Sequence, residues 1–429
     1  MSKIIVGPLM VLCFVGALSS CTEKDEDANK PAAPLAKTTI TALVWAPDWP
    51  EEMHQIAAEF TKENPQIEVN IQFMIGDSVE DNIKPKIASN KLPDFMSVNP
   101  NAYAAELADQ GILTDVSKSA AWGNMLNSLK ADWTTKKNKH YGISGGVAAT
   151  LMYYNKDMFK RAGIIELPTN FDEFLIVCER LKKAGFTPVM WNGGFPNMLG
   201  NGPFSFGFAN NIVVDHPDWK QKISDGSLNF NTPEVADIFS KIKLVADRGY
   251  VQKGYMNTGY DEGIKLFVEG KTAMAFQGTW AAGLLMNGQG FKTGTFIAPW
   301  NVAGKRVVPV IGNETGFAVC ETKNKEASLR FLEFMYDKGF PIQQNKRQNI
   351  PPLKKMAGHV VSDPQITEYI SKVEKFPVRG GLYYLFLPAS TIVVLHSLLQ
   401  DVLDDKITAQ QAAKNLDDSI KNEAQKNNK

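Results

Sequence analysis

The 429-residue sequence predicts an α/β protein of two lobes, each built on a mainly parallel sheet. Apolar, β-branched runs at 38–45 and 67–74 flank a stretch in which Met53, Ile56 and Phe60 recur at helical spacing. Strand, helix and strand in this order indicate a parallel βαβ unit. The chain from 38 onward is also longer than one hydrophobic core usually holds, which favours two lobes.

Helical and strand-like stretches keep alternating along the rest of the chain. The pair Thr169-Asn170 precedes a predicted helix at 171–183, and Thr232 with Pro233 begins another at 232–248, in agreement with helix N-terminal preferences. The other predicted helices span 79–89, 102–109, 325–337, 391–403 and 408–425, and the other predicted strands span 95–98, 187–191, 295–300 and 316–320. The segment 141–154 is glycine-rich and then apolar, which suits a chain that crosses between lobes.

The N-terminus has the order of features found in a signal peptide. Lys3 precedes an apolar run at 4–14 that is too short to span a bilayer, and small residues lead directly to Cys21. This resembles a bacterial lipobox, so 1–20 is predicted to be a lipoprotein signal peptide and Cys21 the lipid attachment site. A plain secretory peptide with an unmodified Cys21 is the alternative. Residues 21–37 lack apolar periodicity and are predicted to form a flexible tether. The mature protein is therefore expected outside the cytoplasm, anchored to a membrane by lipid only.

Composition excludes several classes of function. Basic and acidic residues balance at 46 each and form no basic block, so nucleic acid is not an expected partner. The five histidines have no paired metal-ligand spacing, and we predict no metal site and no cofactor. Cys178 and Cys320 are isolated in apolar patterns, which favours two buried thiols over a disulfide.

Two features of the sequence could carry catalytic chemistry. Residues 142–146 match the G-x-S-x-G pattern around Ser144, but a nucleophile elbow needs a strand before the serine and a helix after it. Here a polar stretch precedes Ser144 and a strand-like run follows, which favours a glycine-rich hinge. A pair of carboxylates for glycoside hydrolysis has no distinctive spacing in this sequence.

The most informative stretch runs from 260 to 286. It predicts a helix at 260–269, a buried strand at 272–276 and a second helix at 280–286 that Thr279 would cap. Trp280 then lies just past the carboxyl end of a strand, where open α/β sheets bind ligands. Trp280 is either a flat platform for a ligand or a packing residue between helices, and this stretch alone does not decide between them.

Other aromatic and polar residues recur at predicted strand ends and turns. Aromatic rings stack on the C–H faces of sugars, and polar side chains hydrogen-bond their hydroxyls. The candidate ligand-binding residues are Trp280, Trp191, Trp45, Trp49, Asp77, Asn99, Asn192, Gln277, Glu314, Arg379 and Tyr383.

In their order along the chain, these features resemble extracellular solute-binding proteins of family 1, the carbohydrate-binding subunits of ABC importers. The resemblance rests on 45–73, on Leu92-Pro93-Asp94, on 141–163 with its YYNKDMF, on 267–280 (FVEGKTAMAFQGTW), on 316–334 and on Ile350-Pro351-Pro352. It covers most of the mature chain.

The resemblance implies a two-lobed, type II periplasmic-binding-protein-like fold that closes on its ligand. Lobe one would comprise 38–150 plus 301–350, and lobe two 151–300 plus 351–429. Trp280 would stack on a sugar from lobe two, near Trp191 and Tyr383. The protein would be a monomeric receptor, not an enzyme, that hands a sugar or oligosaccharide to a membrane permease.

Two alternatives remain. Similar two-lobed proteins bind ferric iron through adjacent tyrosines, and Tyr153-Tyr154 and Tyr383-Tyr384 are such pairs. Strand alternation would turn one ring of the first pair away, which disfavours iron. A secreted hydrolase that uses Ser144 or a carboxylate pair is the other alternative.

Overall fold

The structure is a computed structural model that describes residues 37–76, 78–224, 226–286, 290–347, 350–354, 364, 368, 376 and 379–427. The predicted signal peptide, the predicted tether up to residue 36, and the candidate Asp77 lie outside these residues.

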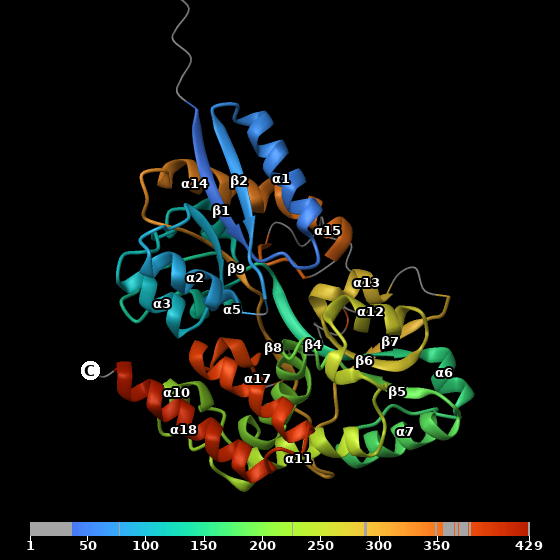
Figure 1. Ribbon diagram of the computed structural model, residues 1–429. Coiled ribbons are helices and arrows are strands. Elements are labelled where there is room, and N and C mark those ends of the chain that lie inside the picture. Colours follow the sequence, from blue (N-terminus) through green and yellow to red (C-terminus); the bar gives the residue numbers. More distant parts are fainter. Residues whose placement is uncertain are drawn as a thin grey trace, which may run out of the picture. The chain divides into compact units, whose positions relative to one another are not determined.

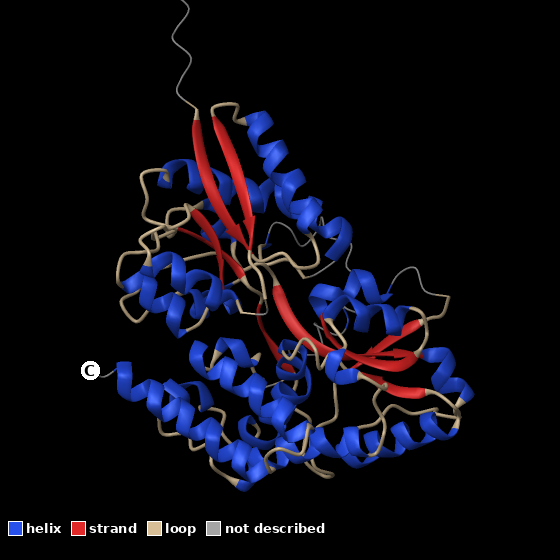
Figure 2. Ribbon diagram, viewed as in Figure 1, coloured by secondary structure: helices blue, strands red, loops and turns tan. Residues whose placement is uncertain are grey.

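The described strands form two sheets, which Figure 2 shows in red. The first has the order β2-β1-β3-β9, and the second the order β5-β6-β4-β7 with β8 paired to β4. The strands are β1 (Thr38–Val44), β2 (Ile67–Phe73), β3 (Phe95–Val98), β4 (Val147–Asn155), β5 (Thr187–Met190), β6 (Thr272–Gly278), β7 (Thr293–Phe296), β8 (Val310–Asn313) and β9 (Gly316–Val319).

Helices cover both sheets (Figure 1). The helices of the N-terminal half are α1 (Pro50–Glu63), α2 (Val79–Ala88), α3 (Ala102–Asp109), α4 (Ala120–Asn124), α5 (Asn127–Lys130), α6 (Lys156–Arg161), α7 (Phe171–Lys183), α8 (Asn197–Leu199) and α9 (Ser205–Phe208). Those that follow are α10 (Trp219–Ser224), α11 (Pro233–Asp247), α12 (Tyr260–Val268), α13 (Ala282–Met286), α14 (Lys325–Phe334), α15 (Phe340–Arg347), α17 (Ala389–Leu403) and α18 (Ala409–Asn427).

The first sheet confirms the predicted βαβ unit. β1 pairs in parallel with β2 and with β3, and only β9 runs antiparallel, against β3. Helix α1 joins β1 to β2 and buries Met53, Ile56 and Phe60, the residues that predicted its apolar face. Pro50 is its first residue, where a missing N–H breaks no helical hydrogen bond.

The second sheet corrects the expectation of mainly parallel sheets. Only β5 and β6 pair in parallel, whereas β4 pairs antiparallel with β6, β7 and β8. The nine-residue strand β4 pairs with β8 through residues 147–150, with β6 through 150–154 and with β7 through 152–155. Strand direction depends on how the connections return, and a strand's own residues do not encode it.

Two large hydrophobic clusters support the two-lobe prediction. One draws on residues between 40 and 147 and between 317 and 353, and the other on residues between 148 and 310 and between 382 and 420. The division falls at Val147 and Ala148, within β4, close to the predicted crossing. Strand β8 pairs into the second sheet although it lies within the 301–350 segment predicted for lobe one. The lobe limits themselves stay a prediction.

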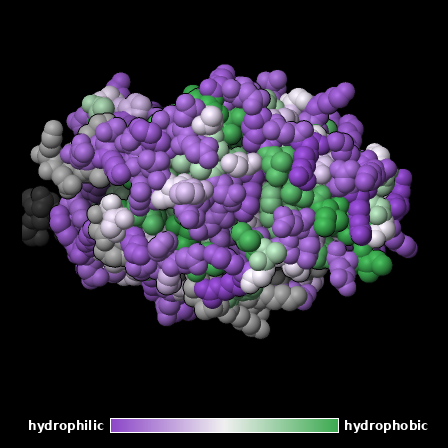
Figure 3. Space-filling view, turned by 90° about the horizontal axis from the view of Figure 1, so that it is seen from below, coloured by the Kyte–Doolittle hydropathy of each residue, from purple (hydrophilic) through white to green (hydrophobic). Residues whose placement is uncertain are grey.

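The described surface is mainly polar. Figure 3 shows one face, mostly hydrophilic with separate apolar patches. The large apolar side chains that are exposed in the described part of the chain are Ile75, Ile165, Ile176, Val302 and Val393. No helix among the described residues is long and apolar enough to cross a bilayer. Cys178 and Cys320 are both buried free thiols, as predicted.

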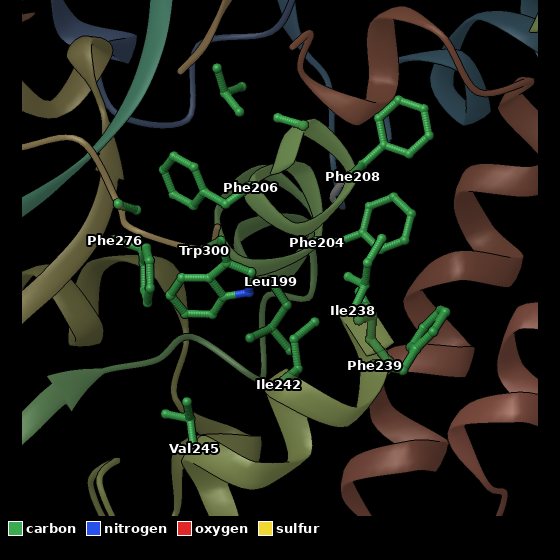
Figure 4. Packing of buried hydrophobic residues seen from close by; sticks show 14 of the residues in the cluster. Leu199, Phe204, Phe206, Phe208, Ile238, Phe239, Ile242, Val245, Phe276 and Trp300 are labelled. Atoms are coloured by element: carbon green, nitrogen blue, oxygen red, sulfur yellow. The ribbon is translucent and has the colours of Figure 1, made fainter. Parts of the chain in front are cut away.

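The core of the second cluster is organised around Trp300 (Figure 4). This fully buried indole lies among aromatic rings with centroid separations of 5.1 Å to Phe171, 5.3 Å to Phe174 and 5.3 Å to Phe276. The Lys241 ammonium donates to the Trp300 carbonyl oxygen over 3.0 Å. Trp300 therefore packs helix α7 against strand β6 and helix α11.

We expect Trp300→Ala to lower the free energy of unfolding by about 3–5 kcal/mol, because neighbouring rings cannot fill the volume of a buried indole. Urea denaturation followed by circular dichroism measures the loss. Trp280→Ala is the control, since Trp280 is a partly exposed indole. A loss no larger for Trp300→Ala than for Trp280→Ala would contradict the central packing role.

Candidate functional site

A cleft with about 940 Å³ of space not filled by protein atoms is lined by residues from the regions of both hydrophobic clusters. The first cluster region comprises 40–147 and 317–353, and the second 148–310 and 382–420. The cleft lies beyond the carboxyl ends of β1, β3 and β6, where open α/β sheets bind ligands. Its polar and aromatic lining includes Trp45, Asp48, Trp49, Glu80, Asn99, Asn197, Asn201, Tyr260, Trp280, Glu314, Arg347, Tyr383 and Tyr384.

Trp280 is held against the backbone of Gly278, the last residue of β6. A Cβ atom placed on Gly278 would lie 2.1 Å from Cζ3 and 2.2 Å from Cη2 of the indole, so any side chain there would displace the ring. The Trp280 side chain also hydrogen-bonds the side chain of Tyr260, the first residue of α12. The indole is thus positioned by a glycine beneath it and a phenol beside it.

Thr279 fixes the turn that carries Trp280. The prediction that Thr279 caps a helix is wrong. Its hydroxyl donates to the Val147 carbonyl over 3.0 Å and accepts from the Ala149 amide over 3.1 Å. Residues 279–281 form a 3₁₀ turn before α13, and no side-chain hydrogen bond caps this turn. The Trp280 turn is therefore attached to the strand that crosses between the clusters.

An ion-pair cluster forms part of the cleft wall. Arg347 Nε donates to Asp48 Oδ2 and Arg347 Nη1 to Glu314 Oε2, each over 3.2 Å. All three side chains are nearly buried, with 11%, 6% and 4% of their surface exposed, respectively. Burial lowers the pKa of the Arg347 guanidinium, but the charges of Glu314 and Asp48 outweigh it and the net pKa is raised. The guanidinium also lies 5.8 Å from the centre of the Trp49 ring.

A third carboxylate, that of Glu80, is held by two amides. Glu80 Oε1 accepts from Asn99 Nδ2 over 3.0 Å and from Asn101 Nδ2 over 2.7 Å. Burial nevertheless raises the pKa of Glu80. Asn101 also caps α3 by accepting from Ala104 N, and its amide lies 3.4 Å from the Tyr384 carbonyl oxygen. Asn101 therefore links α3 of the first cluster region to the segment at 383–385 in the second.

The tyrosines of the opposite wall are tethered through their hydroxyls. The Tyr383 hydroxyl lies 2.7 Å from His396 Nε2, and the Tyr384 hydroxyl donates to the Asn313 carbonyl over 3.1 Å. Beside them, Asn201 Nδ2 donates to Asn197 Oδ1 over 2.6 Å. Asn201 Oδ1 is buried in the cleft wall and has no hydrogen-bond partner, so it remains an acceptor for a donor brought by a ligand.

The structure brings six of the predicted site residues into the cleft lining and leaves four outside it. Those in the lining are Trp280, Trp45, Trp49, Asn99, Glu314 and Tyr383, and those outside are Trp191, Asn192, Gln277 and Arg379. Asp77 lies outside the described residues. The roles of all of them in binding stay predictions.

The four residues outside the cleft have other surroundings. Trp191 follows β5, the edge strand of its sheet, and packs edge-on against Tyr255. Asn192 donates to the Gly259 carbonyl over 2.6 Å. Gln277 is fully buried within β6. Arg379 lines a separate cavity. A position after a strand is thus not sufficient: Trp191 follows the edge strand β5, whereas Trp280 follows β6, which lies inside the sheet.

Several lining residues were not predicted. Asp48 lies between Trp45 and Trp49, and its place in the same turn was an available signal. Tyr260 and Arg347 carry no local signal, because they meet the cleft only through the packing of α12 and α15.

The structure gives no support for Ser144 as a catalytic nucleophile. Ser144 is fully buried, and its hydroxyl donates to the Gly146 carbonyl over 2.8 Å, so a substrate could not reach it. The described residues contain no group of three or more His, Cys, Asp or Glu that could hold a metal ion.

The chain is similar to known binding proteins over most of its length. The multiple sugar-binding protein of Streptococcus mutans serotype c (strain ATCC 700610 / UA159) is 23% identical over 381 residues, covering 82% of this chain and 85% of its own. Among solved structures, a chitin oligosaccharide binding protein has a TM-score of 0.78 at 19% identity, covering 90% of this chain and 98% of its own. The solute-binding protein RafE in complex with raffinose has a TM-score of 0.74 at 20% identity, covering 90% and 99%.

These structural likenesses confirm the predicted periplasmic-binding-protein-like fold. The sequence profile of one family matches residues 46–339, which is more than half of the chain. The chain therefore belongs to the bacterial extracellular solute-binding proteins, a family of binding proteins and not of enzymes.

Proposed function

We propose that this protein is the receptor of an ABC importer, which captures a sugar or oligosaccharide in the cleft and delivers it to a membrane permease. The observation that carries the proposal is Trp280, an indole positioned in the cleft by Gly278 and Tyr260 and facing a lining rich in hydrogen-bonding groups. A multiple sugar-binding protein is similar to this chain in sequence, and RafE, solved in complex with raffinose, is similar to it in fold. Both support a sugar as the ligand.

The lining offers the two kinds of contact that a sugar needs. The Trp280 indole, with Trp45 from the loop after β1, would stack on C–H faces. Asp48, Glu314 and Asn201 would accept hydrogen bonds from hydroxyls. Because these groups come from both cluster regions, a ligand that contacts all of them would favour the closed arrangement of the lobes.

The anchoring proposal rests on the sequence. Cleavage before Cys21 and lipidation of its thiol would leave the folded body on a tether at 21–37, held at the membrane surface outside the cytoplasm. A receptor so placed could meet its permease as a monomer.

The iron alternative finds no supporting geometry. The Tyr153 hydroxyl donates to the Gly278 carbonyl over 3.1 Å, and the hydroxyls of Tyr383 and Tyr384 are engaged by His396 and Asn313. Burial also raises the pKa of Tyr384, which opposes the phenolate that iron requires.

The test of the proposal is titration calorimetry of the mature chain carrying Cys21→Ser against mono- and oligosaccharides, with recovery of the sugar afterwards. One-to-one binding with intact sugar is expected. Absence of binding across the panel would refute the sugar receptor, and recovery of cleaved sugar would refute the purely binding role.

Trp280→Ala is expected to weaken sugar binding at least about tenfold, or about 1.4 kcal/mol, because the stacking surface is lost. Titration calorimetry measures the dissociation constant. Phe186→Ala removes a partly buried ring that is not in the cleft lining and serves as the matched control. Equal affinities of the two variants would refute stacking on Trp280.

Gly278→Ala should also weaken binding about tenfold, because the new methyl group displaces the indole. The same change in a Trp280→Ala background should have little further effect, since no indole remains to be displaced. A double-mutant cycle of dissociation constants measures this. Additive losses would show that Gly278 acts independently of Trp280.

Cys21→Ser should move the protein from the membrane fraction to the soluble extracytoplasmic fraction, because serine offers no thiol for lipidation. Fractionation of a bacterial host followed by mass spectrometry of the N-terminus measures the change. A variant that stays in the membrane fraction would contradict anchoring through Cys21.

A further inference from the structure

We infer that the cleft selects neutral or cationic saccharides and discriminates against those that carry carboxylates, such as uronic acids. This rests on the proposed function and names the substrate class of the same site. The observation behind it is the balance of charged groups. Among the described lining residues, Asp48, Glu80 and Glu314 are acidic, whereas Arg347 alone is basic.

Arg347 is already paired with two carboxylates. Its Nε and Nη1 atoms donate to Asp48 and to Glu314, and only 11% of its side chain is exposed. An acidic sugar that took Nε or Nη1 would displace one of these carboxylates. The displaced group would stay nearly buried without its cation, which is strongly unfavourable.

Glu80 adds to the excess of acidic over basic residues in the lining, but the excess does not depend on it. Its Oε1 atom accepts hydrogen bonds from the side-chain amides of Asn99 and Asn101, so these two donors are engaged within the cleft wall. Burial raises the pKa of Glu80 and so favours its neutral form. Even with Glu80 neutral, Asp48 and Glu314 outnumber Arg347, and the charge of this lining stays negative.

Hydrogen-bonding capacity points the same way. Asn201 is a lining residue whose buried Oδ1 acceptor has no partner, so a ligand donor that reached it would satisfy it. The Tyr384 hydroxyl already donates to the Asn313 carbonyl. A sugar hydroxymethyl or ammonium group supplies a donor, whereas an ionised carboxylate supplies only acceptors. Oxidation of C6 therefore adds an unfavourable charge and removes a donor together.

The experiment is titration calorimetry of the mature chain carrying Cys21→Ser with matched ligand pairs. Galacto- and gluco-oligosaccharides are compared with their C6-carboxylate counterparts and with 2-amino-2-deoxy counterparts of the same length. The neutral member is expected to bind at least about tenfold more tightly than the acidic one, and added salt should narrow the difference. The amino sugar is expected to bind no more weakly than the neutral one.

Equal or tighter binding of the acidic member would overturn the inference while leaving the sugar receptor intact. Binding of no sugar in any class would overturn the proposed function, and the inference with it.

Variants of the ion-pair cluster of Arg347, Asp48 and Glu314 test whether it causes the discrimination between neutral and acidic sugars. Glu314→Gln keeps the shape of the side chain but frees one side of Arg347, so the ratio of neutral to acidic affinity should fall severalfold. Asp48→Asn should lower it in the same way and serves if Glu314→Gln does not fold. Asp215→Asn is the matched control, since it removes the same charge at an exposed pair with Lys305 outside the cleft lining. An unchanged ratio in folded cleft variants would overturn the assignment.

Discussion

The cleft depends on the contact of Arg347 with two carboxylates that would otherwise repel each other. Asp48 follows β1, Glu314 follows β8, and Arg347 ends α15. The guanidinium thus joins three segments that are far apart in the sequence but share one wall of the site. Since all three side chains are nearly buried, loss of any one would leave uncompensated charge inside the protein. The polar groups are consequently placed before a ligand arrives, and binding requires less ordering of side chains.

The turn after β6 supplies the other wall by different means. Here no charge is involved: the Thr279 hydroxyl bridges backbone groups of β4, and the Trp280 indole rests on the backbone of Gly278. Strand β4, which holds the Trp280 turn, also pairs with β8, and β8 is followed directly by Glu314 of the ion-pair cluster. The aromatic and charged parts of the site are therefore supported by neighbouring strands of one sheet.

Much of this fold could be predicted from sequence, and the reasons are local. Helix α3 (Ala102–Asp109) and helix α7 (Phe171–Lys183) begin at the predicted residues because the side chains of Asn101 and Asn170 cap their N-termini. The antiparallel pairing of β4 could not be predicted, since it depends on the return of distant connections. The glycine- and phenylalanine-rich stretch at 193–207 contains α8 and a π-helical segment (Gly200–Phe204), and no helix was predicted there.

The candidate site divides in the same way. Trp280 and Trp191 both follow a strand, but only Trp280 follows one that lies inside its sheet, and strand order is a property of the whole fold. Arg347 illustrates the limit most clearly, because 299 positions separate it from its partner Asp48. A site residue next to a strand end, such as Trp280, could be predicted from the local sequence, whereas Arg347, which reaches the cleft only through tertiary packing, could not.

Asn197 lies in the short helix α8 and Asn201 in the π-helical segment that follows it, and their amides are hydrogen-bonded to each other. Between them, Met198 and Leu199 are buried. The ion-pair cluster and the Trp280 turn are held by hydrogen bonds to other parts of the chain. During divergence of related receptors, substitution of Asn197 or Asn201 would therefore change the polar groups of the cleft while leaving both of those supports and the buried residues of α8 in place, which makes these two positions a route to new ligand preferences.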